Sequence, residues 1–211
     1  MAHYLGLDVS TQSLTGIIID SESSRIIREE AINYDQYFSK KYRVHHGVVE
    51  KGIGVVHSYP LMWVEALDLL FTKIRDNGFD FSSIRALSGC GQQHGTVYLN
   101  KDAPDALKHL LSEKTLVSQL NGIFSRDTSP VWMDSSTSLQ CKEIEHELGG
   151  TQTVLELTGN NVFERFSAPQ IRKFSQQEPK GYEATARITL VSSFIASVLV
   201  GKAVPVDAGD G

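Results

Sequence analysis

The first residues whose side chains could take part in chemistry form a polar turn near the start of the chain. The turn joins two apolar stretches within YLGLDVSTQSLTGIIID at 4–20. The first apolar strand ends at Asp8, and Ser10, Thr11 and Ser13 follow it. A carboxylate at the mouth of a sheet could hold a hydrated Mg²⁺ ion. Hydroxyl groups and the backbone N–H groups of a tight turn could then face phosphate oxygens. An ordinary hairpin whose polar residues simply favour a turn explains the same pattern.

A second polar group lies in the middle of the chain, in the sequence GQQHG at 91–95. Gln92, Gln93 and His94 offer two amides and an imidazole, which can both donate and accept hydrogen bonds. The flanking glycines are expected to let the backbone turn sharply. Such a group suits a polyhydroxylated ligand. A polar turn between strands, with His94 bonded to a neighbouring carbonyl, is an equal alternative.

Two later positions add a carboxylate and a cation. Asp134 follows Trp132 at the end of an apolar segment, where an aromatic face could pack on a sugar while the acid accepts from hydroxyls. The alternative there is a buried tryptophan with an aspartate that caps a helix. Arg165 stands between two phenylalanines that could hold it in place, or it forms a surface pair with Glu164 that contributes little.

Composition excludes several classes of function. The chain has 211 residues, a net charge of -5 and no basic cluster, so neither a nucleic acid nor an acidic membrane surface is expected as partner. No apolar stretch is long enough to predict a membrane span. Cys90 and Cys141 are isolated and predict reduced thiols in a cytoplasmic protein. His45 and His46 lack partners at zinc-like spacing, so no zinc site is predicted.

Hydrophobic patterning predicts one α/β domain with a mixed sheet and flanking helices. The chain should open with an antiparallel meander of three strands, at 4–9, 14–20 and about 25–32. Segment 33–56 is expected to be mixed, with loops at 45–47 and 52–54 and a short strand at 48–49. Later strands are expected at 84–89, 96–99, 130–134, 186–191 and 204–206. Helices are expected at about 58–77, 104–112, 114–121, 137–148, 151–157, 168–176 and 192–200, the fourth capped by Ser135 or Ser136.

Three blocks of sequence together resemble the FGGY carbohydrate kinases. They are GLDVSTQS at 6–13, LSGCGQQHG at 87–95 and PVWMDSST at 130–137. The resemblance implies a ribonuclease H-like fold of the sugar kinase/Hsp70/actin superfamily. It is strongest to members that phosphorylate the ketopentose D-xylulose to xylulose 5-phosphate. It also implies that 1–211 is an N-terminal sugar-binding domain, incomplete at its C-terminal end, without the second, nucleotide-binding domain.

The resemblance also assigns roles to residues of this chain. Asp8 would be the acid that holds Mg²⁺, through water, next to phosphate, with a phosphate-binding turn formed by Ser10, Thr11 and Gln12. Substrate contacts would come from Gln93, His94, Asp134 and Arg165. The role of Asp134 stays open, because Ser136 stands where family members often carry arginine.

The general base of the family is expected beyond Gly211, and Asp207 and Asp210 are interpreted as turn residues. ATP would be the co-substrate, bound by the missing C-terminal domain, so these residues alone are expected to be inactive. The expected partners are a small sugar and, because a missing second domain should leave an apolar face exposed, a second copy in a homodimer. Alternatives are a kinase of the ribulose, glycerol or gluconate type, or a non-catalytic sugar-binding module.

Overall fold

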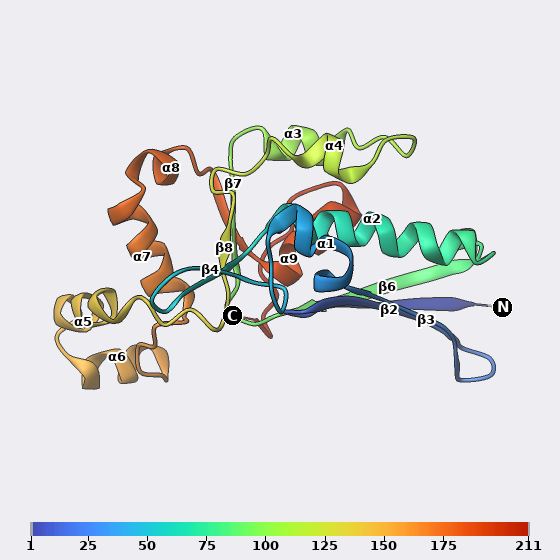
Figure 1. Ribbon diagram of the computed structural model, residues 1–211. Helices are drawn as coiled ribbons and strands as arrows, with labels where there is room; N and C mark the ends of the chain where they lie inside the picture. The colour runs from blue at the N-terminus through green and yellow to red at the C-terminus, as the bar shows by residue number, and fades with distance from the viewer. Residues whose placement is uncertain (1, 211) are drawn as a thin grey trace.

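The computed structural model describes residues 2–210, and its main feature is a four-stranded sheet (Figure 1). The strand order is β3 (Arg25–Asn33), β2 (Ser13–Asp20), β1 (His3–Val9) and β6 (Ile84–Gly91). The first three strands pair antiparallel, while β1 pairs parallel with β6. The mixed sheet with an N-terminal antiparallel meander is therefore confirmed.

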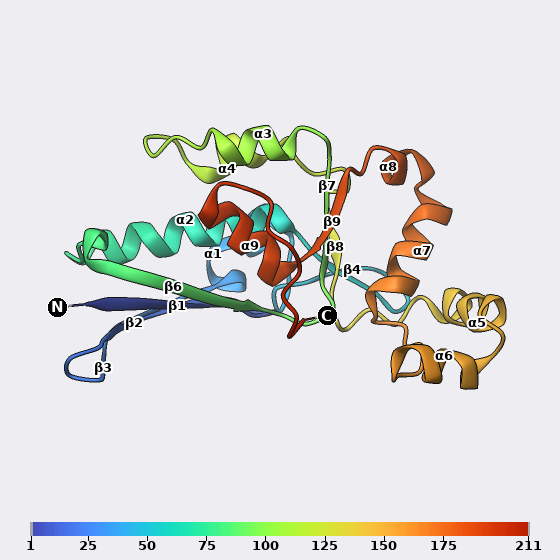
Figure 2. The same ribbon diagram turned by 180° about the vertical axis from the view of Figure 1, so that it is seen from behind.

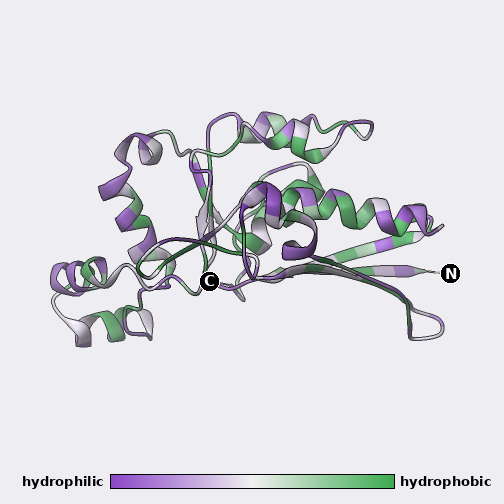
Figure 3. Ribbon diagram, viewed as in Figure 1, coloured by the Kyte–Doolittle hydropathy of each residue, from purple (hydrophilic) through white to green (hydrophobic). Residues whose placement is uncertain are grey.

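Helix α2 (Pro60–Asp76) covers one face of this sheet. Proline suits its first turn because that position has no helical partner for an N–H group. Figure 3 shows that α2 carries several hydrophobic turns, whereas α5 (Ser138–Glu147) is mostly hydrophilic. Glycine at position 16 of β2 lets Leu70 approach the sheet closely, since a Cβ there would lie 2.9 Å from Leu70 Cδ2. The core beneath the helix is formed by Leu5, Leu7, Val9, Leu14, Ile18, Met62, Trp63, Leu67, Leu70 and Ile74.

Two smaller sheets continue the fold beyond the end of β1. One contains β4 (Val49–Gly52), β5 (Val55–Ser58) and β8 (Ser129–Pro130), and the other pairs β7 (Thr96–Leu99) with β9 (Arg187–Leu190). Helix α9 (Val191–Val200) follows β9 directly and packs against β6 and β7. The described C-terminal end lies near the end of the large sheet in both views (Figures 1 and 2).

The remaining helices lie on either side of this framework. Helices α5, α6, α7 and α8 form an arm at the end opposite the N-terminus, and α3 and α4 lie beyond α2 (Figure 2). Their bounds are α3 Ala103–Lys108, α4 Leu116–Leu120, α6 Thr151–Thr158, α7 Ser167–Gln177 and α8 Pro179–Glu183, with a short 3₁₀ helix at Phe81–Ser83. No helix within 2–210 is long and apolar enough to cross a membrane.

Segment 33–56 was expected to be mixed, and no helix was predicted in its first part. Helix α1 (Tyr34–Tyr42) begins there. The side chain of Asn33 accepts a hydrogen bond from Gln36 N, which caps the helix. Tyr34, Phe38 and Tyr42 recur at helical spacing and are buried, so tertiary burial stabilises a helix whose overall composition is polar.

Two predicted strands and one predicted cap also require correction. Only the first residue of the strand expected at 130–134 is extended, because Asp134 N donates to Val131 O and closes a turn. Residues 204–206 form no strand. The residue that precedes α5 is Thr137 rather than Ser135 or Ser136, and its hydroxyl donates to Glu164 O instead of capping the helix.

The backbone behind the β1–β2 turn is tightly packed. Gly47 has a left-handed φ of +75°, and a Cβ on it would lie 2.0 Å from Thr11 O. Gly78 has a similar φ of +80°, but a Cβ on it would meet no atom within 4 Å. Substituting Gly78 therefore tests only the left-handed backbone, whereas substituting Gly47 tests the left-handed backbone together with the close contact to Thr11.

We expect Gly78→Ala to lower the free energy of unfolding by about 1–2 kcal/mol, the cost of a left-handed alanine. Gly47→Ala should lower it by a further ~1–3 kcal/mol, because the added methyl group displaces the Thr11 backbone. Urea denaturation of both variants measures the difference. Equal losses in the two variants would show that the 45–47 loop does not support the β1–β2 turn.

Candidate functional site

The sheet register places Asp8 at the edge where β1 and β6 both end. Asp8 pairs with Thr15 of β2 on one side and with Cys90 of β6 on the other. Its carboxylate accepts hydrogen bonds from Ser10 Oγ at 2.6 Å and from Cys90 Sγ at 3.4 Å. The carboxyl ends of neighbouring parallel strands are a common place for a ligand site in α/β proteins.

Cys90, one of the two isolated cysteines, is exposed. Its side chain lies on the open face of the sheet next to the carboxylate of Asp8. Partial burial and the hydrogen bond to Asp8 raise the pKa of the Cys90 thiol. A protonated thiol is a poor nucleophile, so these surroundings do not activate Cys90.

Asp8 opens into a cleft of about 750 Å³ that brings several predicted residues together. The hydroxyl group of Thr11 connects its two walls. It donates to Gln92 Oε1 at 3.4 Å and accepts from Trp132 Nε1 at 2.9 Å. The lining residues are Asp8, Ser10, Thr11, Gln12, Gly91, Gln92, Gln93, Trp132 and Met133.

The tryptophan of this cleft is not buried. Trp132 is 47% exposed, so the alternative of a core tryptophan is wrong. It leaves its ring available at the edge of the cleft while its N–H group is held by Thr11. By contrast, the only other tryptophan of the chain, Trp63, is fully buried beneath the sheet.

Gly91 and Gly95 were expected to let the backbone turn sharply, but they serve another purpose. The backbone turns at His94, which has a left-handed φ of 63°, while neither Gly91 nor Gly95 has a positive φ. The glycines instead permit close packing against the start of α9. A Cβ at Gly91 would lie 2.9 Å from Ser192 N, and one at Gly95 would lie 2.9 Å from a methyl of Val191.

His94 lines a second cleft of about 220 Å³ that adjoins the first. Its ring packs on Phe166, with the ring centres 4.9 Å apart. Burial and the nearby guanidinium of Arg165 lower the pKa of His94. This favours the neutral imidazole, which has one donor and one acceptor nitrogen. The lining residues are Gln92, Gln93, His94, Ser167, Leu190, Ser192, Gly209 and Asp210.

Arg165 packs against both neighbouring aromatic rings, which themselves lie in contact with one another, so they hold it in place as its sequence context indicated. Its guanidinium carbon lies 5.6 Å from the ring centre of Phe163 and 5.9 Å from that of Phe166. The carboxylate of Glu164 accepts a hydrogen bond from Ser138 Oγ at 3.0 Å instead of pairing with Arg165. The aromatic rings thus orient the cation beside His94.

Asp134 lies inside the protein, away from both clefts' linings. It is 1% exposed. Its carboxylate accepts from Val56 N at 2.9 Å and from Gln170 Nε2 at 2.7 Å. Burial acts to raise its pKa, but hydrogen bonds from Ser136, Gln170 and Val56 outweigh it and hold the pKa of Asp134 below its usual value. Its predicted contact with sugar stays a prediction, while its structural role is to join β5, α7 and the segment after β8.

Asp210, which the sequence interpretation assigned to a turn, also lines one of the two clefts. Its N–H group donates to Asp207 O at 3.0 Å, so the predicted turn is present, and Gly211 lies outside the described residues. Yet Asp210 also lines the cleft of His94 and accepts from Ser192 Oγ at 2.5 Å. An acidic residue in a Gly-rich turn looks the same in sequence whether it faces solvent or a site.

Solved structures with a similar fold include sugar kinases. A xylulose kinase from Bifidobacterium adolescentis has a TM-score of 0.69 at 20% identity, covering 99% of this chain and 36% of its own. A glycerol kinase from Plasmodium falciparum has a TM-score of 0.65 at 17% identity, covering 92% and 33%. The fold is therefore that of the sugar kinases, the ribonuclease H-like class that the sequence predicted.

Sequence similarity narrows the resemblance to one kind of sugar kinase. The chain is 44% identical to xylulose kinase 2 of Arabidopsis thaliana and 43% identical to the xylulose kinase of Rattus norvegicus, over 98% of this chain in each case. It is also 39% identical to D-xylulose kinase A of Aspergillus niger. The chain spans 37% and 38% of the first two relatives' lengths. No family model matches it. The predicted resemblance to xylulose kinases is confirmed.

The buried network around Asp134 generates a pH prediction through His57. His57 Nδ1 lies 2.8 Å from Thr128 Oγ1, and its Nε2 lies 3.6 Å from Asp134 Oδ2. Burial, followed by the nearby Arg126 cation, lowers the pKa of His57 to about 3. In an unfolded chain histidine titrates near pH ~6.5. The unfolded state thus binds more protons, and stability decreases as pH falls from about 6.5 towards 3.

We expect His57→Asn to reduce this pH dependence, because asparagine keeps a hydrogen-bonding group but cannot be protonated. The slope of unfolding free energy against pH should fall by up to about 1.4 kcal/mol per pH unit between pH ~6 and ~4. Urea titrations of the variant and the unmodified chain at each pH measure the slope, and the contribution of His94 cancels in the comparison. An unchanged slope would mean that His57 is protonated in the folded protein.

Proposed function

We propose that this chain forms the sugar-binding part of an ATP-dependent kinase that phosphorylates D-xylulose to xylulose 5-phosphate. One observation supports this most strongly. Gln92 and Gln93 line both the cleft that contains Asp8 and the cleft that contains His94 and Asp210. A phosphate-facing turn and a hydroxyl-facing group of residues therefore adjoin, as transfer of a phosphoryl group to a sugar requires. The sequence similarity to xylulose kinases favours this sugar.

Asp8 and the following turn would face the phosphate side. Carboxylate and hydroxyl oxygens are the ligands that Mg²⁺ prefers, and a single carboxylate suits an ion that keeps several waters. The donor set of Asp8, Ser10 and Thr11 fits such an ion. Mg²⁺ bound there would neutralise charge on the phosphates of ATP. Gln12, at the same turn, would contact phosphate oxygens.

The sugar would lie between the two clefts. Gln93 and His94 would provide hydrogen bonds to hydroxyl groups. Arg165 lines neither cleft, but its cation is near enough to His94 to lower the pKa of that imidazole, and it would contact the sugar from there. The half-exposed ring of Trp132 adds an apolar surface at the edge. This combination of donors, acceptors and an aromatic face suits a polyhydroxylated substrate better than an apolar one.

Asp210 would accept the proton of the attacking hydroxyl group. It is the carboxylate that shares a cleft with Gln93 and His94, and Ser192 orients it. This proposal differs from the expectation of a base beyond Gly211, and it arises from the position of the final turn. The neighbouring Asp207 accepts from Gly209 N at 2.8 Å, which is a local turn contact, and it does not line the cleft of His94.

The proposal includes a second, ATP-binding part, a cytoplasmic location and a homodimer. Both cysteines are free thiols, which suits a reducing compartment. Tyr4 of β1 and Ile26 of β3 lie on the same face of the large sheet, because each pairs with Ile19 of β2. They are 43% and 57% exposed, and a second copy could cover the apolar area that they leave open.

Binding of D-xylulose tests the sugar site directly. Trp132 lies at the edge of the Asp8 cleft whereas Trp63 is buried, so tryptophan fluorescence should change when sugar binds. We expect His94→Ala and Arg165→Ala each to weaken binding by roughly 10-fold or more, the effect of losing hydrogen bonds to charged or buried groups. Isothermal titration calorimetry gives the dissociation constants.

Matched substitutions at exposed positions, His109→Ala and Arg187→Ala, should leave the affinity unchanged. Glycerol and gluconate, tested in the same titration, should bind more weakly than D-xylulose. Unchanged binding in both site variants would reject the site. Tighter binding of gluconate or glycerol would favour a kinase of another substrate class.

In the kinase to which this chain is proposed to contribute, Asp210→Asn should lower kcat by about 10²–10⁴-fold, the usual contribution of a general base. KM for D-xylulose should change little, because asparagine still fits and hydrogen-bonds in the cleft. Asp207→Asn is the matched control and should retain nearly full kcat. Steady-state phosphorylation assays measure both, and full activity of Asp210→Asn would place the base elsewhere.

A further inference from the structure

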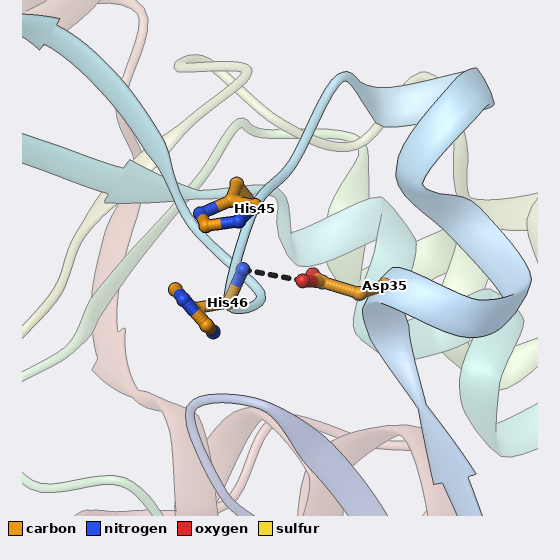
Figure 4. A group of neighbouring side chains, drawn as sticks. All are labelled: Asp35, His45 and His46. Carbon is orange, nitrogen blue, oxygen red and sulfur yellow. Dashed lines mark hydrogen bonds between the residues drawn. The ribbon is translucent and has the colours of Figure 1, made fainter.

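A cluster of two histidines and one aspartate lies behind the β1–β2 turn, outside both clefts (Figure 4). Asp35 belongs to the first turn of α1, and His45 and His46 belong to the loop that precedes β4. The two imidazole rings are 4.0 Å apart between their centres. One ligand atom from each residue lies within 4.8 Å of the other two.

These three residue types form a recognised set of metal ligands. Imidazole nitrogen and carboxylate oxygen bind Zn²⁺ at about 2.0–2.2 Å, which at tetrahedral angles separates the ligand atoms by about 3.3 Å. Both histidines are exposed, so rotation of their side chains can close the remaining gap without moving the core. Imidazole suits Zn²⁺, Ni²⁺ and Cu²⁺ rather than Mg²⁺, which prefers oxygen.

The carboxylate is already oriented for such a role. Asp35 accepts from His46 N at 2.6 Å and from Gly47 N at 2.8 Å, one bond to each oxygen. A carboxylate oxygen with one hydrogen bond still has a lone pair available. The left-handed φ values of His46 (52°) and Gly47 (75°) turn the loop back onto helix α1. Hydrogen bonds of this kind hold ligating carboxylates in position in metal sites.

We propose that Asp35, His45 and His46 bind a divalent transition-metal ion, with Zn²⁺ as the best match. Three protein ligands leave a fourth tetrahedral position for water. This site is separate from the one for Mg²⁺ proposed at Asp8, and it does not depend on the proposed kinase activity. The histidines are adjacent in sequence, and only the fold brings the carboxylate of α1 to them.

A metal bound at this site would stabilise the segments that support the β1–β2 turn. Tyr34 N, at the start of α1, donates to Gln12 O at 2.9 Å. Gly47, next to His46, lies directly against the backbone of Thr11. A metal that joins Asp35 to the loop therefore fastens the two segments that support the β1–β2 turn, and Zn²⁺ raises the thermal unfolding temperature.

Titration of metal-free protein with Zn²⁺ tests the proposal by calorimetry, and Co²⁺ reports the ligands through its visible absorption. We expect one site per chain, insensitive to excess Mg²⁺. His45→Gln and His46→Asn should each weaken Zn²⁺ binding by at least about 10-fold and abolish the thermal shift. Asparagine is chosen at position 46 because it tolerates the left-handed backbone. Circular dichroism checks that each variant folds.

Two control variants identify binding elsewhere. His109→Asn removes another exposed histidine, and Cys90→Ser removes the exposed thiol. Both should bind Zn²⁺ as the unmodified chain does. The proposal is overturned if folded His46→Asn retains full affinity, if Cys90→Ser abolishes binding, or if the unmodified chain binds no Zn²⁺. Sugar binding is measured in a separate titration, so failure of the Zn²⁺ proposal and failure of the sugar proposal can be told apart.

Discussion

Pairing of β1 with a strand on each side is the constraint on which the site depends. The antiparallel bond ladder to β2 places the turn of Ser10–Gln12 at the end of the strand, and the parallel ladder to β6 brings Gln92 and its neighbours to the same edge. A shift of one residue in either register would turn Asp8 towards the core under α2. Leu7 and Val9, buried on that side, oppose such a shift.

Contacts between distant segments then complete the site. Thr11 joins Gln92 and Trp132 through its hydroxyl group, and the start of α9 packs so closely that only glycine fits at Gly91. Buried polar groups elsewhere have a different task. Asp134 holds three parts of the chain together through hydrogen bonds that its burial makes necessary.

Regular patterns were predicted well because they depend on local spacing. The alternation in β1 and β2 and the 3.6-residue repeat of α2 each report which side faces the core. Helix α1 was missed because its stability comes from burial of three aromatic residues on a polar helix. The segment after Pro130 was assigned to a strand because apolar residues predict burial, yet Trp132 and Met133 line an open cleft.

The sequence by itself determined the chemical groups and the strands that carry them: the carboxylate of Asp8, the hydroxyl-rich turn, the amides and imidazole of Gln92–His94, and the likeness to sugar kinases. Tertiary structure alone decided that Asp134 is buried, that Asp210 faces the cleft of His94, and that Asp35 meets His45 and His46. Residue type and spacing set local conformation, but exposure and neighbours depend on segments far apart in the chain. Those contacts exist only after the sheet and its helices have packed.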